Sequence, residues 1–293
     1  MSQAQKNLRG IIAMMLAMGL FVINDTLVKL AREHWEAGQI MAVRGLFGMV
    51  IMAIWLGQSG TLDRLGLVFR PALMGRGALE AAIAAAFITA LGFMPLAEIT
   101  AILMLAPLLI TALSMIFFGE KVGWRRWSAV VVGFLGMLLV VRPGDGTFPL
   151  FALGLAFASV LGVAARDITT RRMPLDVPTA IIALMSIVGT TLAGVVLSLS
   201  GQAWRPVTPE LALIVGAAAL FVAIGNYAIV SACRDAELSV VSPFRYVVII
   251  WAVLLGILVF GDWPRPLALA GIALIGASGL YTLHRERIRQ RSQ

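Results

Sequence analysis

Charged residues, cysteine and histidine are scarce in this chain of 293 residues. Lys, Arg, Asp and Glu make up only 13% of the sequence, whereas a soluble domain carries about 25%. The single cysteine, Cys233, excludes an intrachain disulfide and a metal site built from several cysteines. The two histidines, His34 and His284, fall in a predicted loop and tail. Metal binding is therefore not expected.

Sequence motifs of catalysis are also missing. The chain has no His-Glu-x-x-His zinc helix, no Gly-x-Ser-x-Gly nucleophile turn and no Gly-x-x-x-x-Gly-Lys phosphate loop. The segments between its apolar runs are too short to hold an ATP-hydrolysing domain. We expect no enzyme and no cofactor, so that any transport is either facilitated or coupled to an ion gradient.

Apolar residues dominate what is present. They form 60% of the chain, and the mean hydropathy is +0.95, which is far above a soluble domain at about 45 to 50% apolar residues. The net charge of +8 comes from cations that lie between the apolar runs and near the C-terminus. No basic face interleaved with aromatic residues is visible, so a nucleic-acid partner is not expected. We therefore expect the chain to be embedded in a lipid bilayer.

Apolar runs of about 20 residues, the length that crosses a bilayer, recur ten times along the chain. The first run is too long for a secretory signal and continues into Lys29, so it is expected to be a retained span. The pattern restarts after residue 144, which predicts an all-α integral membrane fold of two five-helix repeats, 1–144 and 145–293. The predicted spans are 10–28, 39–57, 72–94, 97–118, 124–141, 148–168, 178–199, 209–231, 237–260 and 265–283.

The restart has the character of an internal duplication. Adding 142 to the positions of Asp25 and Glu120 gives two further acidic residues, Asp167 and Asp262. Because each half holds an odd number of spans, the second half must be inserted upside down relative to the first. Inverted repeats of this kind are typical of alternating-access transporters, with the substrate site between the halves near mid-membrane.

The distribution of cations predicts the orientation. With the N-terminus in the cytoplasm, fifteen Lys and Arg residues fall in inner loops and tails, and five fall in outer loops. Cytoplasmic loops carry an excess of Lys and Arg. We therefore expect both termini to be cytoplasmic. Five tryptophans near span ends are expected at the membrane interfaces: Trp35, Trp124, Trp127, Trp204 and Trp263.

Charged residues at membrane depth are the first candidates for function, because each costs about 2.5 to 3.5 kcal/mol to insert. Asp25, beside Asn24, and Arg44 fall at one depth when their positions are counted along the helix rise. They predict an ion pair near the outer mouth. Alternatively, Asp25 pairs with Lys29, four residues on along the same helix.

A second polar layer is predicted nearer the inner side. Glu80 and Arg245 fall at a common depth there, and Asn226 and Tyr227 approach the layer from the opposite direction. Two polar layers on either side of an apolar middle would suit two gates that open alternately. In the alternative readings, Glu80 pairs with Arg76 on its own helix, and Arg245 extends to the interface without touching substrate.

Two prolines interrupt otherwise apolar spans. Pro107 and Pro243 remove the hydrogen bonds that would reach the carbonyls four residues earlier, so both helices are expected to kink. Near Pro243, Ser242 and Tyr246 offer hydroxyls to a carboxylate substrate, with the guanidinium of Arg245 beside them. Met104 and Trp251 fall near mid-membrane and could form an apolar wall. Helix packing without substrate contact is the alternative for each of these residues.

The ordered set of motifs resembles a known family. The first half has Ala97-Glu98, Pro107, Gly119-Glu120 and Gly133, and the second half has Ala236-Glu237, Ser242-Pro243-Phe244-Arg245-Tyr246 and Phe260-Gly261-Asp262. With the ten-span layout, these residues resemble the drug/metabolite transporter superfamily of EamA type, and within it YddG-type aromatic amino acid exporters. Asp262 departs from the family pattern, which usually has Glu at that position.

The resemblance implies a secondary transporter in the bacterial inner membrane that exports amino acids and related small metabolites. Because the two joined halves already supply both faces of a cavity, we expect it to function as a monomer. An importer or exchanger of another metabolite, such as S-adenosylmethionine or a cationic drug, is the alternative within transport. A membrane-embedded enzyme or a structural subunit is the alternative outside it.

Overall fold

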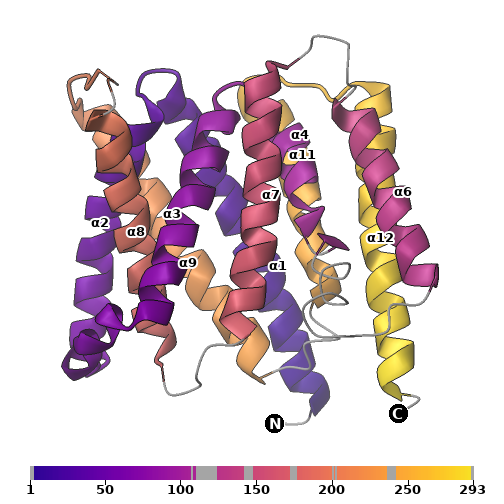
Figure 1. Ribbon diagram of the computed structural model, residues 1–293, viewed down its shortest axis with the longest axis horizontal. Helices are drawn as coiled ribbons and strands as arrows, with labels where there is room; N and C mark the ends of the chain where they lie inside the picture. Colours follow the sequence, from indigo (N-terminus) through magenta and orange to yellow (C-terminus); the bar gives the residue numbers. More distant parts are fainter. Residues whose placement is uncertain are drawn as a thin grey trace.

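The computed structural model is a bundle of long helices with both chain termini at one end (Figure 1). We call this the terminal end and the opposite one the distal end. The structure describes residues 3–106, 108–109, 124–141, 148–171, 177–199, 201, 203–235 and 242–291. Within these ranges all regular secondary structure is helical. The predicted all-α class is confirmed for this part of the chain.

The described helices fall into two groups along the chain. The first half holds α1 (Gln3–Arg32), α2 (Ala37–Gln58), α3 (Pro71–Leu91), α4 (Leu96–Leu103) and α6 (Trp124–Val141). The second half holds α7 (Leu150–Arg171), α8 (Thr179–Leu199), α9 (Pro209–Asp235), α11 (Val247–Phe260) and α12 (Pro266–Arg291). Two 3₁₀ helices complete the described structure: η1 (Leu62–Phe69) and η2 (Ser242–Tyr246).

Four of the described helices are both long and apolar enough to span a membrane: Leu8–Arg32, Ala37–Gln58, Pro71–Leu91 and Ala180–Leu199. Five further apolar helices are shorter, at 10–17 residues: Val131–Val140, Leu150–Arg166, Pro209–Gly225, Phe244–Phe260 and Pro266–Tyr281. A membrane protein is supported, and the count of ten spans stays a prediction.

Helices of the first half pack mainly against helices of the second. Glycines mark where these helices approach most closely. A Cβ placed on Gly189 of α8 would meet the backbone oxygen of Gly77 on α3, and one placed on Gly136 of α6 would lie 2.8 Å from the backbone oxygen of Gly271 on α12. Small residues let backbones approach in this way, which strengthens packing where lipid offers no hydrophobic drive.

The packing partners are arranged alike in the two halves. Helix α1 packs against α9, and α7, which stands first in the second half as α1 does in the first, packs against α3. Likewise α2 packs against α9 while α8 packs against α3, and the last helices of the two halves, α6 and α12, pack together. Figure 1 shows this last pair side by side. A two-fold repeat would produce this pattern, although the repeat and its boundaries stay predictions.

The predicted spans 97–118 and 237–260 are not continuous α-helices. Helix α4 ends at Leu103 and the chain turns at Met104 and Leu105, just before Pro107. A proline ring displaces the carbonyl four residues before it, so an interruption at this place follows from the sequence. Pro107 itself lies outside the described residues. In the second half the chain forms the 3₁₀ turn η2 around Pro243 before α11 begins.

Trp35 was expected at a membrane interface, and the structure shows that this prediction is wrong. Its side chain is 2% exposed and belongs to the main apolar cluster, because the short α1–α2 connection folds it back onto the bundle with its amide bonded to the carbonyl of Ala31 at 2.8 Å. By contrast Trp124, Trp204 and Trp263 are more than half exposed, as interfacial residues would be. Nothing is described for the side chain of Trp127.

Candidate functional site

The interrupted helices α4 and α11 lie against each other near the centre of the bundle, and α1 packs on α11 (Figure 1). Two contacts fix how α1 and α11 are aligned. Gly19 of α1 faces Trp251 of α11, and Lys29 reaches Asp262 just beyond the end of α11. Because the later residue of α1 meets the later residue of the α11 segment, the two helices run side by side in the same direction.

Trp251 fills the space beside α1. A Cβ placed on Gly19 would lie 3.3 Å from Cε2 of the indole, so the glycine makes room for the ring. The indole Nε1 is buried and has no hydrogen-bond partner among the described residues. Trp251 therefore presents an apolar ring with an unused donor beside α1.

Arg245 and Tyr246 carry further unused polar atoms at the start of the same segment. Tyr246 is 8% exposed and its hydroxyl has no partner in the described part of the chain. Its ring packs against Gly279 of α12. The Nε of Arg245 is likewise buried without a described hydrogen-bond partner. A buried polar group without a partner costs about 1 to 3 kcal/mol, so three such groups on one segment need a functional explanation.

Two buried residues of α4 were missed as candidates. Glu98 is 7% exposed and Thr100 is 3% exposed, and the Oγ1 of Thr100 has no described partner. In the sequence, Glu98 was recognised only as part of a family motif. A carboxylate two positions inside an apolar helix was a sufficient signal to nominate it.

Asn24 lies between the predicted partners Asp25 and Arg44. Its Nδ2 donates to Oδ1 of Asp25 at 2.9 Å, and its Oδ1 accepts from NH1 of Arg44 at 3.2 Å. Asp25 lies two helical turns before the distal end of α1, and Arg44 lies two turns after the distal start of α2, a depth of about 10 Å for each. The structure thus brings the three residues together, as a chain rather than as a direct ion pair.

Lys29 does not pair with Asp25, as the alternative reading had it. Its Nζ donates to Oδ2 of Asp262 at 2.9 Å and lies 4.3 Å from the ring centroid of Phe260. Gly261, with φ of 67°, ends α11 in the left-handed conformation, and the amide of Asp262 bonds back to the carbonyl of Gly256 at 3.1 Å. This glycine turn holds the carboxylate over the distal end of α1.

Glu80 of α3 pairs with Arg166 of α7. The NH1 of Arg166 donates to the two carboxylate oxygens at 3.3 and 3.5 Å, and the two side chains are 21% and 25% exposed. Arg76, the partner considered in the sequence analysis, donates to Oγ of Ser186 on α8 at 2.7 Å. Arg166 was missed because its depth in α7 was not compared with that of Glu80.

The remaining predicted residues are placed in part. Met104 is half-buried at the turn that ends α4. Asn226 and Tyr227 lie on α9, and Ser242 and Pro243 lie on η2, but the structure describes none of their side chains. Among the described residues no group of three or more His, Cys, Asp or Glu side chains is placed to hold a metal ion.

Comparison with known families gives a match over the first half of the chain. Residues 8–142 match the EamA-like transporter family. The matched segment covers α1 to α6 and includes Asp25, Arg44 and Glu80. The finding agrees with the resemblance drawn from the motifs of this half.

Relatives over longer stretches are transporters as well. The chain is 25% identical to the pseudopaline exporter CntI of Pseudomonas aeruginosa over 91% of its length and 93% of that protein. It is 23% identical to the S-adenosylmethionine uptake transporter of Rickettsia prowazekii over 96% of its length and 94% of that protein. A riboflavin transporter of Rhizobium johnstonii is 29% identical over 70% of this chain and 68% of its own length.

These relatives point away from the narrower resemblance to YddG-type aromatic amino acid exporters, because they are named for other compounds. A crystal structure aligns with 98% of this chain and 99% of its own, with a TM-score of 0.67 at 18% identity. At that identity it shows a shared fold over the full length and nothing of the substrate.

Proposed function

We propose that this protein is a secondary transporter that moves small organic metabolites by alternating access, with a substrate pathway along α1, α4 and α11. The observation that carries the proposal is the row of buried, unused polar atoms on the interrupted η2–α11 segment: Arg245 Nε, Tyr246 OH and Trp251 Nε1. Interrupted helices near the centre of a bundle are where secondary transporters bind substrates. The family match and the transporter relatives support the same reading.

Two ion pairs between the halves are the proposed gates. Lys29 with Asp262 joins the halves at the distal end, and Glu80 with Arg166 joins them nearer the termini. Alternating access requires that the substrate site open to one side at a time, so one pair separates while the other holds. In this proposal, the state in which both pairs are formed is closed on both sides.

Amino acids are the proposed substrates, with export as the proposed direction. A guanidinium presents N–H donors in a fixed planar fork that matches a carboxylate, and the Nε of Arg245 has no described hydrogen-bond partner of its own. Trp251 offers a ring for the side chain of the substrate. Asp25 and Glu80 are the candidate groups for a coupling proton.

Uptake or exchange of S-adenosylmethionine is the second candidate. It is favoured by the relatives that carry this name, one of which aligns over 96% of the chain. The buried carboxylate Glu98 on α4 offers a negative charge to a cationic substrate. The exporter and uptake relatives match this chain at similar identity, so direction must be measured.

Uptake into proteoliposomes tests the proposal. Labelled phenylalanine, methionine, threonine and S-adenosylmethionine are offered to vesicles with and without protein, and with and without an imposed pH gradient. Saturable uptake of an amino acid is expected, and stimulation by the gradient would establish proton coupling. Uptake of S-adenosylmethionine alone would select the second candidate, and no uptake of any compound would refute both.

The role of Arg245 is tested by Arg245→Lys. The ammonium keeps the charge but loses the planar fork, so affinity for a carboxylate substrate should fall about tenfold, which corresponds to about 1.4 kcal/mol. Arg205→Lys, in an exposed distal connection, is the matched control and should bind as the unaltered protein does. Equal affinity of the two variants would assign Arg245 to packing.

A further inference from the structure

Thr100 of α4 differs from the other buried hydroxyl residues in the described part of the chain. Six serines and threonines are buried there. Five of them donate to a carbonyl three or four residues earlier on their own helix: Thr26, Ser159, Thr190, Thr191 and Ser278. Such bonds satisfy a hydroxyl within a helix. The hydroxyl of Thr100 is 3% exposed and bonds to no described residue, so it needs another explanation.

The face of α4 that carries Thr100 becomes accessible one turn further along the helix. All residues from Leu96 to Ile102 are buried, and they cover every direction around the helix axis. Leu103 and Met104, which follow, are partly exposed. The amide of Met104 bonds to the carbonyl of Thr100 at 3.1 Å, so both side chains lie on one face, with Leu103 beside them. Thr100 therefore lies where the accessible part of this face ends.

Thr100 also lies on the distal side of the unused polar atoms of α11. Helix α4 begins at the distal end (Figure 1), so Thr100, four residues in, is about 6 Å from that end. Helix α11 ends there, and Trp251, nine residues before Phe260, is about 14 Å from it. Arg245 precedes α11 and lies deeper still. Because α4 packs against α11, the two segments offer unused polar atoms at successive levels.

We infer that the hydroxyl of Thr100 is a specificity contact, which bonds a polar group at the distal end of the transported molecule. The inference rests on the proposed function, in which a substrate carboxylate lies at Arg245 and the substrate side chain runs along Trp251. Thr100 is the next polar group in the distal direction. A threonine hydroxyl can donate and accept, so it suits a substrate side chain that ends in a hydroxyl or an amine.

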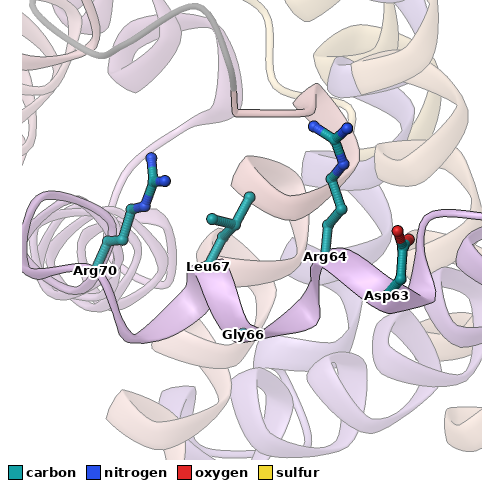
Figure 2. Close-up of a pocket in the computed structure, with 5 residues that line it drawn as sticks. All are labelled: Asp63, Arg64, Gly66, Leu67 and Arg70. Atoms are coloured by element: carbon teal, nitrogen blue, oxygen red, sulfur yellow. The ribbon is translucent and has the colours of Figure 1, made fainter.

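Thiol labelling tests the position of Thr100 and requires no transport. In a Cys233→Ser background, Thr100→Cys is treated with aminoethyl methanethiosulfonate. The matched control is Thr190→Cys on α8, where the threonine is also buried and its hydroxyl donates to Ser186 at 2.7 Å. Thr100→Cys should react about tenfold faster than the control. Asp63→Cys, in a surface pocket of η1 (Figure 2), gives the rate of an exposed thiol.

Equal rates for the two buried thiols would overturn the inference. Because the labelling does not depend on a substrate, this failure is distinct from a failure of the proposed function.

Uptake of tyrosine and phenylalanine tests the contact itself, since the two differ by one hydroxyl. A net hydrogen bond is worth about fivefold in affinity, so the KM for tyrosine should be about fivefold the lower. Thr100→Val removes the hydroxyl and should make the two KM values equal, whereas Thr100→Ser and the control Thr190→Val should keep the ratio. An unchanged ratio in Thr100→Val would overturn the inference. Uptake of neither compound would instead refute the proposed function.

Thermal unfolding in detergent gives an independent check. Thr100→Val gives up no hydrogen bond and removes a buried polar group, so it should raise the melting temperature by about 3 °C. Thr190→Val loses the bond to Ser186 and should bring no rise. A lower melting temperature for Thr100→Val would show that its hydroxyl has a structural partner and would overturn the inference.

Discussion

The two proposed gates between the halves are built in different ways. At the distal end Lys29 and Asp262 are 2.9 Å apart, and the lysine also lies over Phe260. Nearer the termini Glu80 and Arg166 are 3.3 Å apart and join two regular helices. The distal carboxylate is held by a glycine turn, whereas the other is held only by its helix. The distal closure is therefore the better organised of the two.

Three residues before Glu80 on α3, at Gly77, α3 and α8 meet through backbone. Glycines at 77 and 189 bring the two helices into direct contact. Contacts of this kind do not rearrange without separating whole helices, whereas ion pairs of side chains can break singly. The comparison predicts that the contact between α3 and α8 is rigid. It also predicts that the two ion pairs can each separate, and that the distal pair is the stronger.

The largest effect is expected from Gly189→Ala. The added Cβ would meet the backbone of Gly77, so α3 and α8 must move apart at a cost of about 3 kcal/mol. Thermal unfolding in detergent measures the loss. Gly154→Ala, where a Cβ meets nothing within 4 Å, is the control and should be neutral or slightly stabilising. Equal melting temperatures for the two variants would disprove the backbone contact.

The second effect concerns the polar chain of α1 and α2. Arg44→Ala leaves Asn24 and Asp25 without their cationic partner and should cost about 2 kcal/mol of stability. Exchanging the charges, Asp25→Arg with Arg44→Asp, should restore part of the loss because Asn24 can bond either group. Arg205→Ala is the exposed control. If the exchanged protein is less stable than Arg44→Ala alone, the charges do not interact.

The third effect tests the distal gate. Asp262→Asn removes the ion pair with Lys29, which we expect to contribute about 1 kcal/mol because Asp262 is 37% exposed to screening water. In a Cys233→Ser background, a cysteine replacing the buried Val28 should react about fivefold faster with a membrane-impermeant maleimide. Glu36→Gln, which alters an ion pair within the first half, should leave the rate unchanged. An unchanged rate in Asp262→Asn would exclude this gate.

The smallest effect is expected at the other gate. Glu80→Gln loses a longer ion pair between regular helices. The rate of maleimide labelling is therefore expected to rise only about twofold, which corresponds to about 0.4 kcal/mol. The readout is maleimide labelling of a cysteine replacing the buried Ala164 of α7, with the reagent supplied from the side of the termini. Asp63→Asn on η1 serves as the control. If Glu80→Gln raised the labelling rate by a larger factor than Asp262→Asn, the gate near the termini would be the stronger of the two.

The depth of a residue along its helix could be predicted from the sequence. This explains why some of the predicted partners lie close together in the structure. Counting positions along the helix rise placed Asp25 and Arg44 at one level, and the structure joins them through Asn24. The same count was not applied to Asp262 or Arg166, so it did not find the partners of Lys29 and Glu80. Depth gives the level of a residue but not the direction in which its side chain points around the helix axis.

Proline positions predicted where helices would be interrupted but not how. Pro107 and Pro243 indicated kinks, and the structure shows a turn at Met104 and a 3₁₀ segment, η2, around Pro243. Which carbonyls find new partners depends on the neighbouring helices. Trp35 teaches the same lesson, because its place near a span end predicted an interfacial ring, whereas the fold of the α1–α2 connection buries it.

The sequence by itself determined that this protein is helical and apolar enough for a bilayer, because length and hydropathy act locally along each run. It also located some of the charges within the bundle, such as Asp25, Arg44 and Glu80, since a charge in an apolar run is visible without a fold, although Glu98 and Arg166 were not nominated. Only the tertiary structure decided which charges meet and which polar atoms stay unused on η2 and α11. Those outcomes depend on the rotation of one helix against another, which is fixed by close contacts such as Gly19 with Trp251 and Gly77 with Gly189.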